Sequence, residues 1–166
     1  GVGLRVVGKA PAFADGTGGL LVANHVSWLD IFALLACVDV RFVAKSEIRS
    51  WPVLGGVVEH SGTLFHSRRN RQHTAQVMGQ VSQALAEGKT VAVFPEGTST
   101  DGQRVEPFKS SLFQAAIDSR RPVWPVLIHF PQVGGGCHTA LAYYGEMNLW
   151  QSLRQVLASR DSRADV

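Results

Sequence analysis

Cysteine is scarce in this chain, and its two cysteines fit neither a metal site nor a disulfide framework. Cys37 and Cys137 lie far apart, and neither belongs to a Cys-x-x-Cys pair. That spacing argues against structural zinc, and two cysteines are too few for a disulfide-stapled scaffold. We therefore expect two buried thiols in a reducing compartment and no metal site.

Charged residues are also few. They make up 17% of the 166 residues, against 45% hydrophobic residues, whereas a disordered chain would be more polar. The length is sufficient to bury a core without disulfides or metals. We predict a single domain over residues 1–166, with its motifs within about residues 5–145 and a disordered polar tail at residues 159–166.

The chain has no long uninterrupted hydrophobic run. The best candidate for a membrane span, residues 20–40, contains Asn24, His25, Ser27 and Asp30. An aspartate at a bilayer centre costs about 2.5–3.5 kcal/mol, so we predict no spanning helix there. The sequence starts at Gly1 and shows no secretory signal.

Basic residues exceed acidic ones only slightly, giving a net charge of +3. They are scattered and do not alternate with aromatic residues, which argues against nucleic acid as a partner. Two interpretations of the excess stay open: an ordinary soluble surface, or attraction to phosphate groups and acidic lipid headgroups.

Two common enzyme signatures are missing. A serine hydrolase of the α/β type needs a Gly-x-Ser-x-Gly turn, and the sequence contains none. The tripeptide Gly88-Lys89-Thr90 suggests a nucleotide-binding loop, but that pattern requires glycine where Gln83 stands, and a helix where a strand is expected.

Short apolar runs alternate with amphipathic segments along the chain. This alternation predicts an α/β fold: a single-domain sandwich with a mixed, largely parallel sheet flanked by helices. Proline 125 inside an apolar run predicts an edge strand or a bulge. The expected strands are residues 4–7, 20–23, 40–44, 63–66, 90–94, 123–130 and 138–143, and the expected helices are residues 28–37, 72–86, 111–117 and 149–157.

The first candidate site motif is residues 24–30. His25 and Asp30 are five positions apart, which would place them about 140° apart on one regular helix. They can meet if His25 lies in the turn after a strand and Asp30 lies in the first turn of the next helix. Asp30 would then orient the imidazole and leave its second nitrogen free to accept a proton. The alternative is that Ser27 and Asp30 form a helix capping box.

Two further motifs follow predicted strands. Arg68 ends the segment 62–68, where a guanidinium can bind phosphate or carboxylate. Glu96 and Gly97 follow the strand at residues 90–94, at the edge where α/β sheets commonly bind ligands. Glu96 would bind Arg68 or a substrate hydroxyl; the alternative is a Glu–Arg pair that only fixes the loop.

Four blocks in this order resemble the glycerolipid acyltransferase family, which includes the lysophosphatidic acid acyltransferases. The family carries an NH-x4-D block, a G-x5-R block, an FPEGTRS block and a hydrophobic block with proline. The corresponding segments here are residues 24–30, 62–68, 94–100 and 123–126. The resemblance implies a glycerol-3-phosphate acyltransferase-like fold.

The resemblance also implies roles for individual residues. His25 resembles the general base that deprotonates the acceptor hydroxyl, and Asp30 resembles its orienting partner. A thioester donor is already activated, so direct attack needs no acyl-enzyme. The predicted substrate-binding residues are Arg68, which resembles the phosphate ligand, with Glu96, Gly97, Thr98, Gly62 and Lys45.

One position departs from the family pattern. Ser99 stands where the family has an arginine. Lys45, Arg104 or Lys109 would have to compensate for the missing cation. The alternative is another acceptor, because residues 96–113 resemble bacterial members that acylate lyso-ornithine lipids.

The expected function is transfer of a fatty-acyl group from acyl-CoA or acyl carrier protein to 1-acylglycerol-3-phosphate, in phospholipid biosynthesis. No cofactor is expected. We expect the cytoplasmic face of the membrane as the location, with peripheral attachment or an N-terminal anchor absent from this chain. Alternatives outside this class are a lipid hydrolase and a non-catalytic lipid-binding module.

Overall fold

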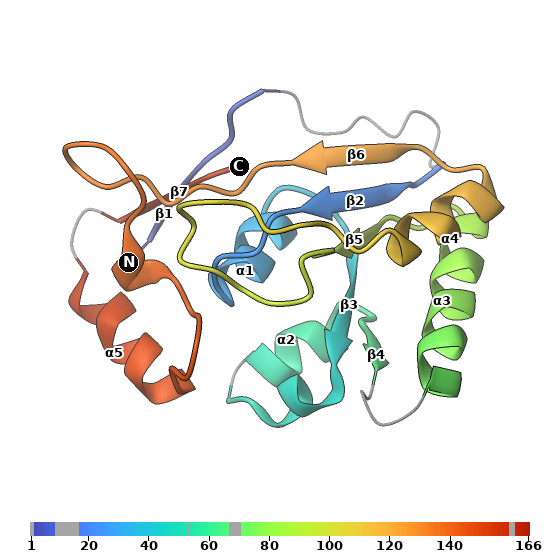
Figure 1. Ribbon diagram of the computed structural model, residues 1–166, viewed down its shortest axis with the longest axis horizontal. Coiled ribbons are helices and arrows are strands. Elements are labelled where there is room, and N and C mark those ends of the chain that lie inside the picture. Colours follow the sequence, from blue (N-terminus) through green and yellow to red (C-terminus); the bar gives the residue numbers. More distant parts are fainter. Residues whose placement is uncertain (1, 9–16, 53, 67–70, 160–161) are drawn as a thin grey trace.

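A computed structural model places a five-stranded parallel sheet at the centre of the chain (Figure 1). It describes residues 2–8, 17–52, 54–66, 71–159 and 162–166. The strand order is β4-β3-β5-β2-β6, and each neighbouring pair runs parallel. The strands are β2 Leu20–Ala23, β3 Arg41–Lys45, β4 Leu64–His66, β5 Val91–Val93 and β6 Val123–Val126.

Helices cover both faces of this sheet. Alternate residues of β2 point to opposite faces: Leu21 packs in a cluster with α1 and α2, whereas Leu20 packs with α3 and α4. Burial on both faces explains why β2 is a continuous apolar run. The helices are α1 Leu29–Leu35, α2 Leu54–His60, α3 Arg71–Ala86, α4 Ser111–Ser119 and α5 Leu149–Ala158, with 3₁₀ helices η2 Ser46–Ser50 and η3 Thr139–Leu141.

The predicted α/β sandwich with a largely parallel sheet is confirmed. β6 is an edge strand, as Pro125 indicated, so the missing proline N–H removes no bond to a further strand. Because all five strands are parallel, their carboxyl ends share one edge, and α5 lies on the side to which β2 and β6 point (Figure 1). Within the described residues, no helix combines the length and apolar character needed to cross a bilayer.

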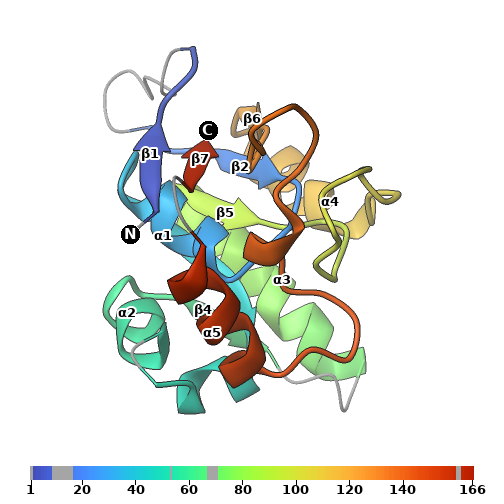
Figure 2. The same cartoon turned by 90° about the vertical axis from the view of Figure 1, so that its left-hand side faces the viewer.

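The prediction of a disordered tail is wrong for residues 162–166; residues 160–161 lie outside the described part. The strand β7, Arg163–Asp165, pairs in parallel with β1, Gly3–Arg5, and the two lie side by side in Figure 2. His129 also exchanges two backbone hydrogen bonds with Asp165, of 2.9 and 2.7 Å. Backbone pairing on both sides orders this segment, Ala164 lies in the apolar core and Val166 packs against it.

Two predicted strands also need correction. The strand expected at residues 123–130 ends at Val126, because its partner β2 ends at Ala23. No strand forms at residues 138–143. His138 donates its backbone N–H to the Phe130 carbonyl at 2.7 Å, and the chain continues as the 3₁₀ helix η3 instead of lengthening the sheet.

Candidate active site

The structure brings His25 and Asp30 together at the carboxyl end of β2. His25 lies in the turn after the strand, and Asp30 lies in the first turn of α1. The His25 Nδ1 atom is 2.8 Å from Asp30 Oδ2. The Asp30 side chain is fully buried, whereas 22% of the His25 side chain is exposed. The predicted pairing is therefore confirmed; the catalytic role stays a prediction.

Asp30 holds the turn as well as the ring. The same Oδ2 atom accepts the backbone N–H groups of Val26, at 2.8 Å, and Ser27, at 3.0 Å. One of the two bonds of the expected capping box is therefore present, from the Ser27 N–H to the Asp30 side chain. The other is missing, because Ser27 Oγ has no hydrogen-bond partner among the described residues. The N-cap of α1 is Trp28. With Nδ1–H directed at a carboxylate, Nε2 is the nitrogen that remains to accept a proton.

An aromatic ring fixes the imidazole from its face. Phe94 stacks on the His25 ring with centroids 4.2 Å apart and planes inclined by 17°. Phe94 in turn stacks against Phe42 of β3 at 6.2 Å. This contact was not predicted from the sequence, although Phe94 directly follows β5, the strand beside β2.

The Glu96 carboxylate accepts hydrogen bonds from two backbone N–H groups. Its Oε1 accepts the His25 N–H at 2.6 Å and its Oε2 accepts the Glu106 N–H at 2.7 Å. Its exposed fraction is 5%. The backbone carbonyl of His25 accepts the Thr100 N–H at 2.9 Å, so the segment after β5 holds both backbone groups of the histidine. Direct contact of Glu96 with an acceptor stays a prediction.

The turn after Glu96 forms part of the cleft wall. Gly97 has a φ of +72°, and the Lys109 ammonium occupies the space that a side chain at position 97 would take. Thr98 and Ser99 line the cleft beside it. The Ser99 hydroxyl donates to the Tyr143 carbonyl, so it joins this turn to the loop before α5.

The remaining predicted substrate-binding residues lie in three different places. Lys45, the last residue of β3, lines the cleft. Gly62 lies in the turn before β4 and against Arg41. Arg41 begins β3, so Gly62 lies at the end of that strand opposite to Lys45. Arg68 lies outside the described residues. The binding roles of all three stay predictions. Of the other cations considered, Arg104 is paired with Glu106 at 2.7 Å.

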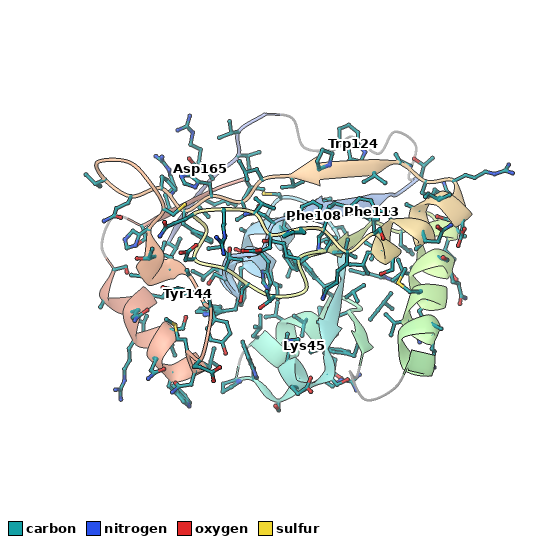
Figure 3. All side chains as sticks on the ribbon, in the orientation of Figure 1. Lys45, Phe108, Phe113, Trp124, Tyr144 and Asp165 are labelled. Atoms are coloured by element: carbon teal, nitrogen blue, oxygen red, sulfur yellow. The ribbon has the colours of Figure 1, made fainter. Side chains whose placement is uncertain are left out.

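His25 opens into a cleft of about 490 Å³. The lining residues from α1, β3, η2 and α2 are mostly apolar, whereas the turn after β5 contributes polar groups. Figure 3 shows Lys45 and Tyr144 on separate elements, β3 and the loop before α5. Burial raises the pKa of the Tyr143 phenol, so it stays neutral. The apolar lining residues include Trp28, Ile31, Phe42, Val43, Ala44, Ile48, Trp51 and Leu54.

Fold and site together define an α/β domain that presents a carboxylate-tethered histidine to an open, half-apolar cleft. The sequence profile of the family described as Acyltransferase matches residues 4–129. The chain belongs to this acyltransferase family, as its four motifs predicted.

Named relatives support the same assignment. The chain is 38% identical over 159 residues to the 1-acyl-sn-glycerol-3-phosphate acyltransferase of Neisseria gonorrhoeae, covering 96% of this chain and 61% of that protein. It is 36% identical over 178 residues to the lyso-ornithine lipid O-acyltransferase of Brucella abortus (strain 2308), covering 100% and 65%.

A solved structure shares the fold. The crystal structure of the 1-acyl-sn-glycerophosphate (LPA) acyltransferase PlsC from Thermotoga maritima matches with a TM-score of 0.63 and 27% identity, over 80% of this chain and 52% of that chain. The chain thus spans less than two thirds of the length of each of these relatives.

Proposed function

We propose that this domain transfers a fatty-acyl group from a thioester donor to the hydroxyl group of a lysolipid, with His25 as general base. The observation that carries the proposal is the 2.8 Å contact between His25 Nδ1 and the buried Asp30 carboxylate. This contact leaves Nε2 as the proton acceptor on a ring that lines the cleft.

The reaction follows from these two residues. His25 Nε2 takes the proton of the acceptor hydroxyl while the hydroxyl oxygen attacks the carbonyl carbon of the thioester. The tetrahedral adduct then expels the thiolate, and the imidazolium returns the proton to the leaving sulfur. Asp30 stabilises the transient imidazolium, by the logic of a catalytic triad in which the substrate supplies the nucleophile.

The walls of the cleft fit an amphipathic substrate. Apolar side chains on β3, η2 and α2 can cover an acyl chain, while Thr98 and Lys45 lie among the residues that can face a polar headgroup. A cleft lined by both apolar and polar side chains fits a lysolipid better than a small water-soluble alcohol.

The favoured acceptor is 1-acylglycerol-3-phosphate, with lyso-ornithine lipid as the second candidate. Two observations favour the second. Ser99 replaces the family's arginine and is hydrogen-bonded to the Tyr143 carbonyl. A relative named lyso-ornithine lipid O-acyltransferase matches the whole chain. The Lys109 ammonium lies against Gly97 and Lys45 lines the cleft, and we expect these two side chains to bind a phosphate beside this turn.

The donor and the location complete the proposal. The donor is acyl-CoA or acyl carrier protein, and no further cofactor takes part. Because the acceptor resides in a bilayer, the domain works at the cytoplasmic face of the membrane, held peripherally or by a segment outside this chain.

The test is an acceptor panel. Purified protein is incubated with labelled palmitoyl-CoA or palmitoyl carrier protein and either lysophosphatidic acid or lyso-ornithine lipid. Labelled phosphatidic acid or ornithine lipid would support the proposal and identify the acceptor. Release of free palmitate from the donor with no acylated lipid would contradict it and favour a hydrolase.

Arg68 offers a second test, although it lies outside the described residues. If Arg68 binds the acceptor phosphate, Arg68→Ala should raise the KM for lysophosphatidic acid about tenfold or more, because a charge-assisted bidentate contact is lost. Arg154→Ala on the exposed face of α5 is the control. An unchanged acceptor KM in the Arg68 variant would contradict the assignment.

A further inference from the structure

Glu96 is a buried charged group that the mechanism above does not use. The family resemblance places it with the acceptor-binding residues, yet it is absent from the described residues that line the cleft. Both of its carboxylate oxygens are already hydrogen-bonded to backbone N–H groups, those of His25 and Glu106. With 5% of the residue exposed, little of this carboxylate is open to a ligand.

The turn between β2 and α1 explains the need for such a group. A chain that leaves a strand for a helix has backbone N–H groups without ladder partners, and burying them unpaired is costly. Two carboxylates accept hydrogen bonds from three successive backbone N–H groups. Glu96 accepts that of His25, and Asp30 accepts those of Val26 and Ser27. Glu96 therefore fixes the backbone of the histidine, whereas Asp30 fixes its ring.

The second oxygen extends this restraint to the turn after β5, which also lines the cleft. By accepting the Glu106 N–H, it closes the loop that begins with Gly97 and Thr98, two residues of the cleft wall. One side chain thus bonds both the backbone of the base and this turn, and it fixes their relative position. A catalytic group displaced by about 1 Å can lose about 100-fold in rate, so this relation bears on turnover.

On this geometry, and building on the proposed function, we infer that Glu96 is a positioning residue for the base His25 and not a ligand of the acceptor. Its carboxylate acts through the His25 amide and contacts no substrate. The two roles predict different kinetics. Loss of a positioning residue lowers kcat, whereas loss of an acceptor ligand raises the acceptor KM.

The test is Glu96→Gln, which keeps the shape of the side chain. The carboxamide retains one acceptor oxygen, and its NH₂ group must face one of the two backbone N–H donors, which breaks that bond. We expect kcat to fall about 10- to 100-fold with the acceptor KM unchanged. Glu87→Gln, which changes an exposed glutamate immediately after α3, is the matched control and should leave both constants unaltered.

A double-mutant cycle sharpens the result. If Glu96 acts through His25, the double variant His25→Ala/Glu96→Gln should be no slower than His25→Ala alone. A raised acceptor KM in Glu96→Gln, or two effects that multiply, would overturn the inference. If Glu96→Gln does not fold, Glu96→Asp keeps the charge and shortens the reach; the same kcat loss at constant KM is expected, and a KM effect would overturn the inference.

A measurement without turnover separates this inference from the proposed function. The ¹⁵N shifts of the His25 ring, assigned by their loss in His25→Ala, should change in Glu96→Gln while those of the exposed His60 stay the same. This change without acyl transfer to any acceptor would contradict the proposed function alone. Unchanged His25 shifts and an unchanged kcat in an active enzyme would contradict the inference alone.

Discussion

Replacement of Asp30 by asparagine tests the His–Asp pair through both stability and rate. Asp30 is fully buried, and its Oδ2 accepts three N–H donors, two of them from the backbone of the turn. Since these donors are fixed, the carboxamide oxygen must take the Oδ2 position. The NH₂ group then occupies the place of Oδ1, which has no hydrogen-bond partner among the described residues.

The expected loss of stability follows from these contacts. A buried, unpaired NH₂ group costs about 1–3 kcal/mol, and the three bonds that lose charge assistance add roughly 1–2 kcal/mol together. We therefore expect Asp30→Asn to lower the free energy of unfolding by roughly 2–5 kcal/mol. Urea denaturation followed by circular dichroism measures this difference.

The expected loss of rate follows from the charge. The asparagine oxygen still faces His25 Nδ1, so the ring keeps its tautomer, but the imidazolium formed during the reaction loses its anion. Two unit charges about 4 Å apart interact by about 4 kcal/mol at an effective dielectric constant of about 20. That energy corresponds to about a 10³-fold lower kcat.

The assay is acyl transfer at saturating lysolipid, normalised to the folded fraction. Asp118→Asn, an exposed carboxylate on α4 that bonds the Gln114 side chain, is the control and should retain full rate. A folded Asp30→Asn protein with a rate close to that of the unmodified domain would refute the reasoning, because the carboxylate would then serve only the turn.

Three further predictions follow from single contacts. Phe94→Leu removes the stacked ring that restrains His25 and should lower kcat about tenfold with little change in acceptor KM, measured by steady-state kinetics. Asn24→Ala leaves a buried backbone N–H and C=O beyond β6 unpaired and should lower the free energy of unfolding by about 2–4 kcal/mol in urea denaturation. The pKa of the Cys137 thiol is raised mainly by burial and secondly by the charge of Asp101. Alkylation of Cys137 by iodoacetamide at pH 8 should therefore be slower in the folded than in the unfolded protein, and it should accelerate at higher pH.

The spacing of His25 and Asp30 defined the condition under which they could meet. A five-residue separation excludes a meeting on one helix, so it requires a turn at His25, and the structure has that turn. The sheet was predictable for a similar reason: fully buried strands such as β2 are short apolar runs, and parallel strands place their carboxyl ends at one edge.

Contacts between distant segments could not be predicted from local pattern. The Phe94 ring reaches His25 only because β5 lies beside β2, and the order of strands in the sheet cannot be predicted from the residues of either strand. The same holds for the tail: residues 163–165 are polar and lack apolar alternation, and they form β7 because the edge of β1 and the backbone of His129 offer them hydrogen-bond partners. Glu96 was noticed, but its sequence position indicates nothing about the two amides it pairs.

The most direct measurement is the acyl-transfer rate of His25→Ala with its preferred acceptor, beside His60→Ala, which changes an exposed histidine at the end of α2. The account predicts a loss of about 10²–10⁴-fold for His25→Ala, with an unaltered fold, and no loss for His60→Ala. Near-normal turnover in folded His25→Ala protein would contradict the account, because no general base would then act from that position.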